Sequence, residues 1–401
     1  MRQNSDYAEA QVTSRKSMRE YREISKERQK RFQPFYQRII QDVLINEESD
    51  APVCSPACMM LWLAVLTEMS FGRTRKQILD AVGMKDAASF SQAADAVWNA
   101  ETMDEKDGIC RLSSSVWLNR ENDCLCSRQM ELGKQFELSH TDIFAGETGS
   151  DSMNRELREW LNEHTGGKLK DQVSGISLES GIQAALFSAI YFKAGWEIEF
   201  SKPRRSAFHG EDRSGKCQMM KAGDILPYFR GDQFRAVCLG LTCIGRSVFL
   251  ILPNEKISIN TLLKSPSFYE LMEKGEEHPR WEMAQVELYL PQIQAEAQIN
   301  LIPYLEKEGI LDVFDAQAAD FSPLMVLENL SRPFYVSQAD HVVHLEWDED
   351  GVEGAAYTGG ILTGLPPSER ENIIFRLDRP FIYLIMSSDG SLLFAGAVRN
   401  L

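Results

Sequence analysis

The sequence has no stretch of about 18 consecutive apolar residues, the length that a membrane-spanning helix needs. Its first residues, MRQNSDYAEAQVTSRKS, contain no apolar run that resembles the core of a signal peptide. We therefore expect no membrane partner, and a protein that stays in the cytoplasm or is exported without a visible signal of its own.

The sequence also lacks paired CxxC motifs, although it contains eight cysteines. Structural zinc sites commonly use two such motifs, so we expect no metal site, and we expect no cofactor. Most of the cysteines lie in apolar stretches, which is typical of reduced thiols in a core. These are Cys54, Cys110, Cys124, Cys126, Cys217, Cys238 and Cys243.

Positive charge is scarce outside the N-terminus. The chain has 43 lysines and arginines against 59 aspartates and glutamates, a net charge of −16. A surface of this sign repels nucleic-acid phosphates on average, so no nucleic-acid partner is expected. Basic residues are dense only within residues 1–34, where they alternate with glutamates as on a solvated helix face. We expect this segment to be a charged, helical extension.

No low-complexity linker and no internal repeat divides the remaining sequence. The composition, 43% hydrophobic and 25% charged, is that of an ordinary globular protein. We therefore expect residues 35–401 to form one α+β domain. Pro34 can open its first helix, because proline is favoured in the first turn.

Local signals mark two further helices. Ser55 is a typical N-cap, Pro56 fits the first helical position, and the apolar run that follows predicts a helix buried on all sides. Thr74 and Gln77 have the spacing of a capping box at the start of a shorter helix.

Several segments have the apolar density of strands that are covered on both faces, which indicates a large sheet packed on helices. They are residues 112–119, 184–192, 246–253, 285–291, 341–347, 381–386 and 391–398.

Four separated segments resemble the serpin family, in the same order and with similar separations. They read SPACMMLWLAVLTEMSFGRTRKQI, AIYFKAGW, LYLP with GILDVFDAQAADFS, and VSQADHVVHLEWDEDGVEGAAYT with DRPFIYLI and GSLLFAGAVRN. Together they span the chain from about residue 35 to its end. The resemblance implies the serpin fold, an α+β domain with three β-sheets, about nine helices and an exposed reactive-centre loop at about 349–370.

The resemblance also implies a hinge at the start of this loop. If the hinge enters a sheet as a strand, its residues alternate between two faces. Val352 and Ala356 then lie on a row of small or apolar side chains, whereas Glu353 and Tyr357 lie on the opposite row. The hinge comprises Glu349, Asp350, Gly351, Val352, Glu353, Gly354, Ala355, Ala356, Tyr357 and Thr358.

The register of the resemblance places the reactive bond at Leu365–Pro366. Most serine proteases cleave poorly before proline, because its ring fixes φ and crowds the leaving-group side. The bonds Leu362–Thr363, Thr363–Gly364 and Gly364–Leu365 are therefore alternatives.

The resemblance implies a suicide-substrate inhibitor rather than an enzyme, a monomer whose partner is a target protease in a covalent complex. The segment around the reactive bond, residues 361–367, which we call the bait, contains no charged residue. It therefore favours elastase-, chymotrypsin- or subtilisin-like targets, or a papain-like cysteine protease that accepts Leu362. The segment after Gly83 is acidic where some family members bind polysaccharide, so a heparin-like partner is not expected.

Two alternatives stay open. One is a non-inhibitory serpin with a carrier, chaperone or storage role, which the unusual hinge residues Val352, Gly354 and Tyr357 leave open. Valine is nearly isosteric with the usual threonine, however, and Tyr357 lies on the outward row, so inhibition stays the leading hypothesis. A hydrolase that pairs Cys or Ser with His341 has no nucleophile motif to support it.

The resemblance further implies a polar cluster that controls sheet opening, formed by Ser55, Cys58, Ser188 and His341. Cys58 replaces the usual serine and Ser188 the usual asparagine, which weakens the available hydrogen bonds. Trp196 is expected in the core at the top of the opening sheet. His341 and His344 do not form a metal pair, because strand residues three apart face opposite sides.

Overall fold

The computed structural model of the chain describes residues 30–106, 108–119, 141–167, 175–243, 245–324, 334–353 and 370–401. Several predicted positions lie outside these ranges: the extension up to residue 29, the hinge residues Gly354, Ala355, Ala356, Tyr357 and Thr358, and the reactive-bond residues Leu362, Thr363, Gly364, Leu365 and Pro366.

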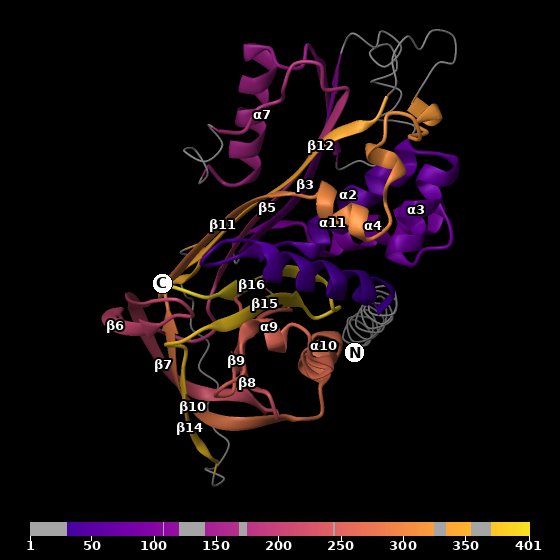
Figure 1. The fold of residues 1–401 in the computed structure, drawn as a ribbon. Coiled ribbons are helices and arrows are strands. Elements are labelled where there is room, and N and C mark those ends of the chain that lie inside the picture. The colour runs from indigo at the N-terminus through magenta and orange to yellow at the C-terminus, as the bar shows by residue number, and fades with distance from the viewer. Residues whose placement is uncertain are drawn as a thin grey trace, which may run out of the picture.

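A seven-stranded sheet forms the upper half of the molecule in Figure 1. Its strand order is β11-β12-β13-β5-β3-β2, and β4 also pairs with β3. The strands are β2 (Met103–Glu105), β3 (Gly108–Asn119), β4 (Thr141–Gly146), β5 (Ala184–Gly195), β11 (Ile293–Asn300), β12 (Val336–Trp347) and β13 (Gly351–Val352).

The other strands form a nine-stranded network in the order β1-β16-β15-β9-β8-β7-β10-β14, with β6 paired to β7. They are β1 (Val53–Cys54), β6 (Arg204–His209), β7 (Ser214–Arg230), β8 (Phe234–Gly240), β9 (Arg246–Pro253), β10 (Trp281–Pro291), β14 (Asn372–Arg376), β15 (Phe381–Ser387) and β16 (Leu392–Val398). The long strand β7 pairs with β6, β8 and β10. It therefore joins two of the three expected sheets into one continuous hydrogen-bonded network.

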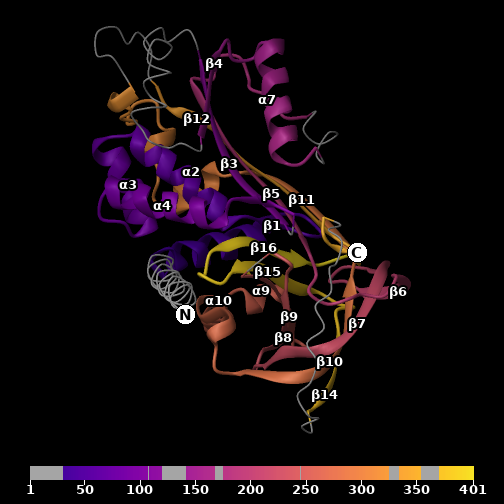
Figure 2. The ribbon, with the colours of Figure 1, turned by 180° about the vertical axis from the view of Figure 1, so that it is seen from behind.

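Helices cover both faces of the seven-stranded sheet, as the two opposite views in Figures 1 and 2 show. The helix α7 (Asp151–His164) packs on one face through a separate apolar cluster that includes Trp117 and Phe187. On the other face lie α2 (Pro56–Met69), α3 (Gly72–Val82) and α4 (Ala87–Glu101). The helix α2 contacts β5 of this sheet and β16 of the other, so it lies between the two sheets.

The remaining described α-helices are one long helix whose apolar residues belong to the core, and three short ones. They are a helix over residues 30–46, α9 (Ile259–Leu262), α10 (Pro266–Lys274) and α11 (Ile302–Lys307). None of the helices in the described ranges is long and apolar enough to cross a membrane.

Local sequence signals explain where α2 begins. The Ser55 hydroxyl accepts a hydrogen bond from the Cys58 amide, and Pro56 occupies the first helical position. Every residue of α2 except Glu68 is buried, as its apolar composition predicts. This helix therefore presents its N-terminus, and the cap Ser55, to the interior of the molecule.

Two predicted helix starts are wrong. Helix α3 begins at Gly72, and Thr74 is not its cap, because its hydroxyl accepts the Asp320 amide instead. Gln77 likewise accepts the amide of Asp312, so both side chains anchor a distant segment rather than their own helix. Pro34 does not open the first helix either, because residues 30–33 are already helical.

Candidate functional site

The start of the loop enters the seven-stranded sheet between two strands. Strands β5 and β12 run parallel and pair directly from Ala184↔Val336 to Ile190↔Val343. Beyond this point β13 lies between them and pairs with both, through Trp347↔Val352 on one side and Ala194↔Val352 on the other. We call the line between β5 and β12 the slot: the two strands close it by pairing with each other up to Ile190 and Val343, and beyond these residues it already holds two residues of the hinge.

A tight turn connects β12 to β13. The Asp348 amide donates to the Gly351 carbonyl at 3.0 Å, and the Asp348 carboxylate accepts the amides of Asp350 and Gly351. Glu349 accepts a 2.7 Å bond from Gln292, which ties the turn to the chain before β11. Asp348 was not predicted as a site residue, although the Asp350-Gly351 pair that follows Glu349 is a recognisable turn signal.

Gly351 has to be glycine in this arrangement. Its φ is +155°, and a Cβ atom there would lie 2.3 Å from the Ala194 carbonyl oxygen and 2.8 Å from the Gly195 Cα. The backbones of β13 and β5 therefore approach more closely than any side chain permits.

The two last described hinge residues point to opposite faces. Val352 is completely buried opposite Trp347, on the face that packs on the core. Glu353 has a left-handed φ of +55° and is also buried, and its amide donates to the Glu346 carbonyl at 2.9 Å. The chain thus leaves the extended conformation at Glu353, where regular strand pairing stops.

Trp196 lies directly beside the hinge turn. Its ring is 1% exposed and packs edge-on against Trp347 with a centroid distance of 6.3 Å. Its Nε1 donates a 2.8 Å hydrogen bond to the Asp348 carbonyl. Trp196 therefore contacts both β12 and the turn that delivers the hinge.

The four residues of the polar cluster come together at the middle of the β5–β12 pair. The Ser55 amide donates to His341 Nε2 at 2.9 Å, so Nδ1 carries the ring proton and donates to Ser188 Oγ at 2.8 Å. Cys58 Sγ donates to the Ala189 carbonyl at 3.4 Å. His341 thus links β12 to β5 and to the N-terminus of α2.

Burial sets the protonation states in this cluster. Loss of hydration lowers the pKa of His341 to about 3, so the imidazole is neutral under ordinary conditions. Burial also raises the pKa of Cys58 to about 12, so its side chain is a thiol rather than a thiolate. The links between β5, β12 and α2 are therefore hydrogen bonds between neutral groups.

The far end of the loop belongs to the other sheet. Strand β14 runs parallel to β10, with Asn372 opposite Gln285. Before it, Glu371 pairs with Arg230 at 2.7 Å. The loop between Glu353 and Arg370 therefore connects the slot in one sheet to an edge strand of the other.

Comparisons with known proteins agree over almost the whole chain. A family model described as Serpin (serine protease inhibitor) matches residues 32–401. The serine protease inhibitor of Cyanea capillata is 28% identical and covers 87% of this chain and 92% of that protein. Antichymotrypsin-2 of Bombyx mori is 26% identical and covers 90% of this chain and 95% of that protein. These relatives carry the names of inhibitors.

The fold is also found in solved protein structures. Human thyroxine-binding globulin superposes with a TM-score of 0.79 at 19% identity, over 94% of this chain and 99% of that one. The predicted α+β architecture is confirmed by this likeness.

Proposed function

Because the chain belongs to the serpin family, we propose that it is a suicide-substrate inhibitor of endopeptidases that forms a covalent complex with its target. The observation that carries this proposal is the position of β13 between β5 and β12. A strand that continues from Val352 along the same slot would separate the two parallel strands and pair with both. Serpin loop insertion is an established example of such strand addition.

The proposed reaction begins as ordinary proteolysis. The protease serine attacks a carbonyl carbon in the loop, its proton passes to the leaving amine, and an acyl-enzyme ester forms as the peptide bond breaks. The loop, released from β14, then enters the slot and carries the acylated protease with it. A displacement of about 1 Å in the catalytic geometry of a protease can cost roughly 100-fold in rate, so deacylation stops.

Insertion has an identifiable cost and gain. It breaks the pairing between β5 and β12 and the Ser188–His341 hydrogen bond at its centre. In return the new strand forms ladders with both neighbours. Each ladder bond contributes roughly 0.5–1.5 kcal/mol net, so a dozen contribute on the order of 10 kcal/mol.

We propose Leu365–Pro366 as the reactive bond in the family register, with cleavage one to three residues earlier as the alternative that proline favours. The bait contains no charged residue from Ile361 to Pro367. A protease with an apolar or small specificity pocket is therefore the proposed target class, and the inhibitor acts as a monomer.

A carrier function is the second candidate. Glu353 interrupts the extended backbone at φ +55°, and insertion requires it to return to a negative φ. A hinge that stays fixed in this conformation would suit a static binding protein, and the fold is shared with a protein named for thyroxine binding.

The deciding experiment incubates the protein with elastase-, chymotrypsin-, subtilisin- and papain-like proteases and resolves the products on denaturing gels. We expect an SDS-stable complex with at least one of the first three. Mass spectrometry of the released C-terminal peptide identifies the bond. Clean cleavage without a complex, and without a rise in thermal stability, would support the carrier function. Cleavage only after Arg370 would contradict the proposed register.

A further inference from the structure

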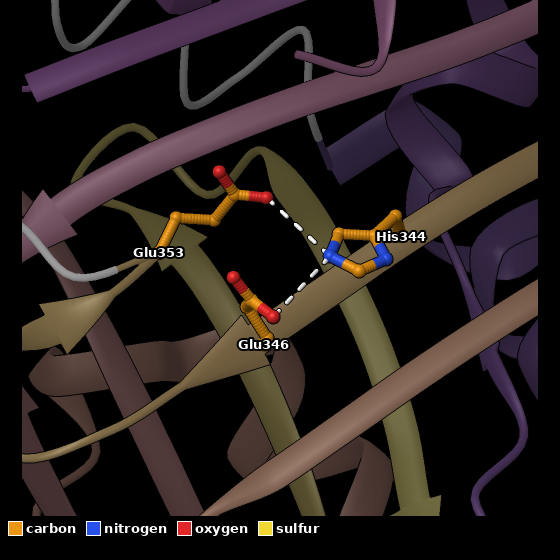
Figure 3. A group of neighbouring side chains, drawn as sticks. All are labelled: His344, Glu346 and Glu353. Carbon is orange, nitrogen blue, oxygen red and sulfur yellow. Dashed lines mark ion pairs between the residues drawn. The ribbon is translucent and has the colours of Figure 1, made fainter. Parts of the chain in front are cut away.

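His344, Glu346 and Glu353 converge beside the hinge (Figure 3). His344 Nε2 lies 3.7 Å from a Glu346 oxygen and 3.6 Å from a Glu353 oxygen. His344 and Glu346 are two residues apart on β12 and therefore share a face. Glu353 reaches the same point from the loop.

We propose that these three side chains bind a divalent transition-metal ion of the Zn²⁺ type, which fastens the hinge to β12. Zinc takes imidazole nitrogen and carboxylate oxygen at about 2.0–2.2 Å, so neighbouring ligands of a tetrahedral ion lie about 3.4 Å apart. The observed separations of 3.6 and 3.7 Å are longer than hydrogen bonds and close to this value. Three protein ligands leave a fourth position for water.

The orientation of the imidazole supports the proposal independently. His344 Nδ1 lies 3.2 Å from a Glu296 oxygen on the neighbouring strand β11, within reach of a hydrogen bond. When Nδ1 donates its proton to this carboxylate, Nε2 presents a lone pair to Glu346 and Glu353. A carboxylate behind a histidine ligand is the usual arrangement at zinc, because it fixes the tautomer and the ring orientation.

The site is enclosed and built from defined backbone. The side chains of His344 and Glu353 are each 2% exposed, and that of Glu346 is 31% exposed. The Glu353 amide donates to the Glu346 carbonyl, which holds the two carboxylates on adjacent segments. The left-handed φ of Glu353 turns its side chain toward His344 instead of continuing the strand. Imidazole and partial burial favour Zn²⁺ over Ca²⁺ or Mg²⁺, which prefer all-oxygen sites.

Metal binding would oppose movement of the hinge. Glu353 has to leave its left-handed conformation before the loop can extend as a strand. A metal that holds its carboxylate on β12 therefore slows insertion. This consequence rests on the proposed inhibitory function: with slower insertion, more acyl-enzyme hydrolyses before it is trapped, and more inhibitor is consumed per protease.

The first test uses no protease, so it is independent of inhibition. Metal-free full-length protein is titrated with Zn²⁺ by calorimetry, and with Co²⁺, whose visible absorption reports tetrahedral coordination. We expect one equivalent to bind, with at least tenfold weaker affinity in Glu353→Gln and in His344→Gln. Glu296→Gln should bind 10- to 100-fold more weakly, as other variants behind a ligating histidine do.

The matched controls are Glu349→Gln, which changes a hinge carboxylate that contacts Gln292, and His209→Gln on exposed β6. Both should bind as the unmodified protein does. Thermal unfolding without metal verifies that each variant is folded. Undiminished Zn²⁺ binding in both Glu353→Gln and His344→Gln would place the ion elsewhere and overturn the proposal, as would no binding by the unmodified protein.

A second test measures the number of inhibitor molecules consumed per protease with and without Zn²⁺. We expect Zn²⁺ to raise this number for the unmodified protein and not for Glu353→Gln. Equal effects on both proteins would overturn the role of the metal at the hinge. If no protease is trapped at all, the inhibitory function fails while the calorimetric result still decides the metal site.

Discussion

The indole nitrogen of Trp196 donates a 2.8 Å hydrogen bond to the backbone carbonyl of Asp348. Trp196 follows β5 and Asp348 follows β12, so one bond joins the ends of the two strands that border the slot. Asp348 in turn organises the turn that places Gly351 and Val352 in the sheet. The position of the hinge therefore depends on a side chain more than 150 residues away in sequence.

Replacement of Trp196 by phenylalanine should loosen the hinge. Phenylalanine keeps most of the apolar contact and loses the bond to Asp348, at a cost of about 1 kcal/mol in the free energy of unfolding. We expect faster amide hydrogen exchange in residues 348–353, measured by mass spectrometry. Trp98→Phe is the control, because it loses a comparable bond to the Leu112 carbonyl far from the hinge. Equal exchange in both variants would contradict the link between Trp196 and the turn.

Replacement of Gly351 by alanine should expel the hinge from the sheet. The added Cβ would lie 2.3 Å from the Ala194 carbonyl oxygen, a contact that only backbone separation relieves. Glu353, buried in the present structure, then becomes accessible. A glutamate-specific protease should cleave after Glu353 at least several-fold faster, as identified by mass spectrometry.

The control for this variant is Gly223→Ala on β7, where an added Cβ meets nothing within 4 Å. It should be cleaved at the rate of the unmodified protein. Unchanged cleavage of Gly351→Ala after Glu353 would show that β13 tolerates a side chain and that the close approach to β5 is not required.

His341 should make stability depend on pH in mildly acidic solution. Its pKa is about 3 in the folded protein, because of burial, and about 6.5 in an unfolded chain. Between these values the unfolded state binds a proton that the folded state does not, so stability falls as the pH is lowered from about 6.5 toward 3. Urea unfolding between pH 7 and pH 5 measures this fall.

His341→Asn removes the titrating group and should flatten this part of the profile, while lowering stability at pH 7 through the lost bonds to Ser55 and Ser188. Glu101 has the opposite effect on stability: burial raises its pKa to about 7, so the folded state binds a proton that the unfolded state does not, and stability rises as the pH is lowered through this range. Glu101 is unchanged in both proteins, so the difference between the two profiles isolates His341. Parallel profiles would contradict the prediction.

The described cysteines should resist alkylation in the folded protein. Six of them are buried free thiols, and burial raises the pKa of each. Thiolate is the reactive form, so a short treatment with iodoacetamide at pH 8 should leave these six unmodified and alkylate them only after denaturation. Peptide mapping distinguishes them from Cys124 and Cys126, which lie outside the described residues. Rapid native labelling of Cys58 would contradict its place in the closed cluster.

Apolar runs in the sequence predicted those strands that are buried on both faces. The segment 246–253 coincides with β9, which is buried along its whole length. Strand β7 was not predicted, because many of its residues are exposed and its buried positions follow no simple alternation. Thr74 has the spacing of a helix cap, yet its hydroxyl is used by a residue 246 positions away. A pattern of nearest neighbours carries no information about such a partner.

The candidate site also has a part that the sequence predicted and a part that only the structure shows. The family resemblance named His341, Ser55 and Ser188. Only the fold shows that the His341 imidazole accepts a hydrogen bond from the Ser55 amide, at the start of α2, and donates one to the Ser188 hydroxyl on β5. Alternation along an ideal strand puts Val352 and Glu353 on opposite faces. It does not predict the left-handed backbone at Glu353, which depends on the sheet around it.

Replacement of Val352 by lysine tests whether inhibition requires β13 to stay between β5 and β12, the position from which insertion would continue. Val352 is completely buried between β5 and β12, and an ammonium group there lacks the hydration that it needs, at a cost of several kcal/mol. The loop of Val352→Lys should still be cleaved, but the acyl-enzyme should hydrolyse, with at least tenfold less SDS-stable complex than the unmodified protein forms. The control is Ile374→Lys, which adds the same charge on β14 at a side chain that is 64% exposed. This control should trap protease normally, because its lysine stays in water. If Val352→Lys traps protease as well as Ile374→Lys does, trapping does not depend on β13 between β5 and β12, and inhibition has to proceed by another route.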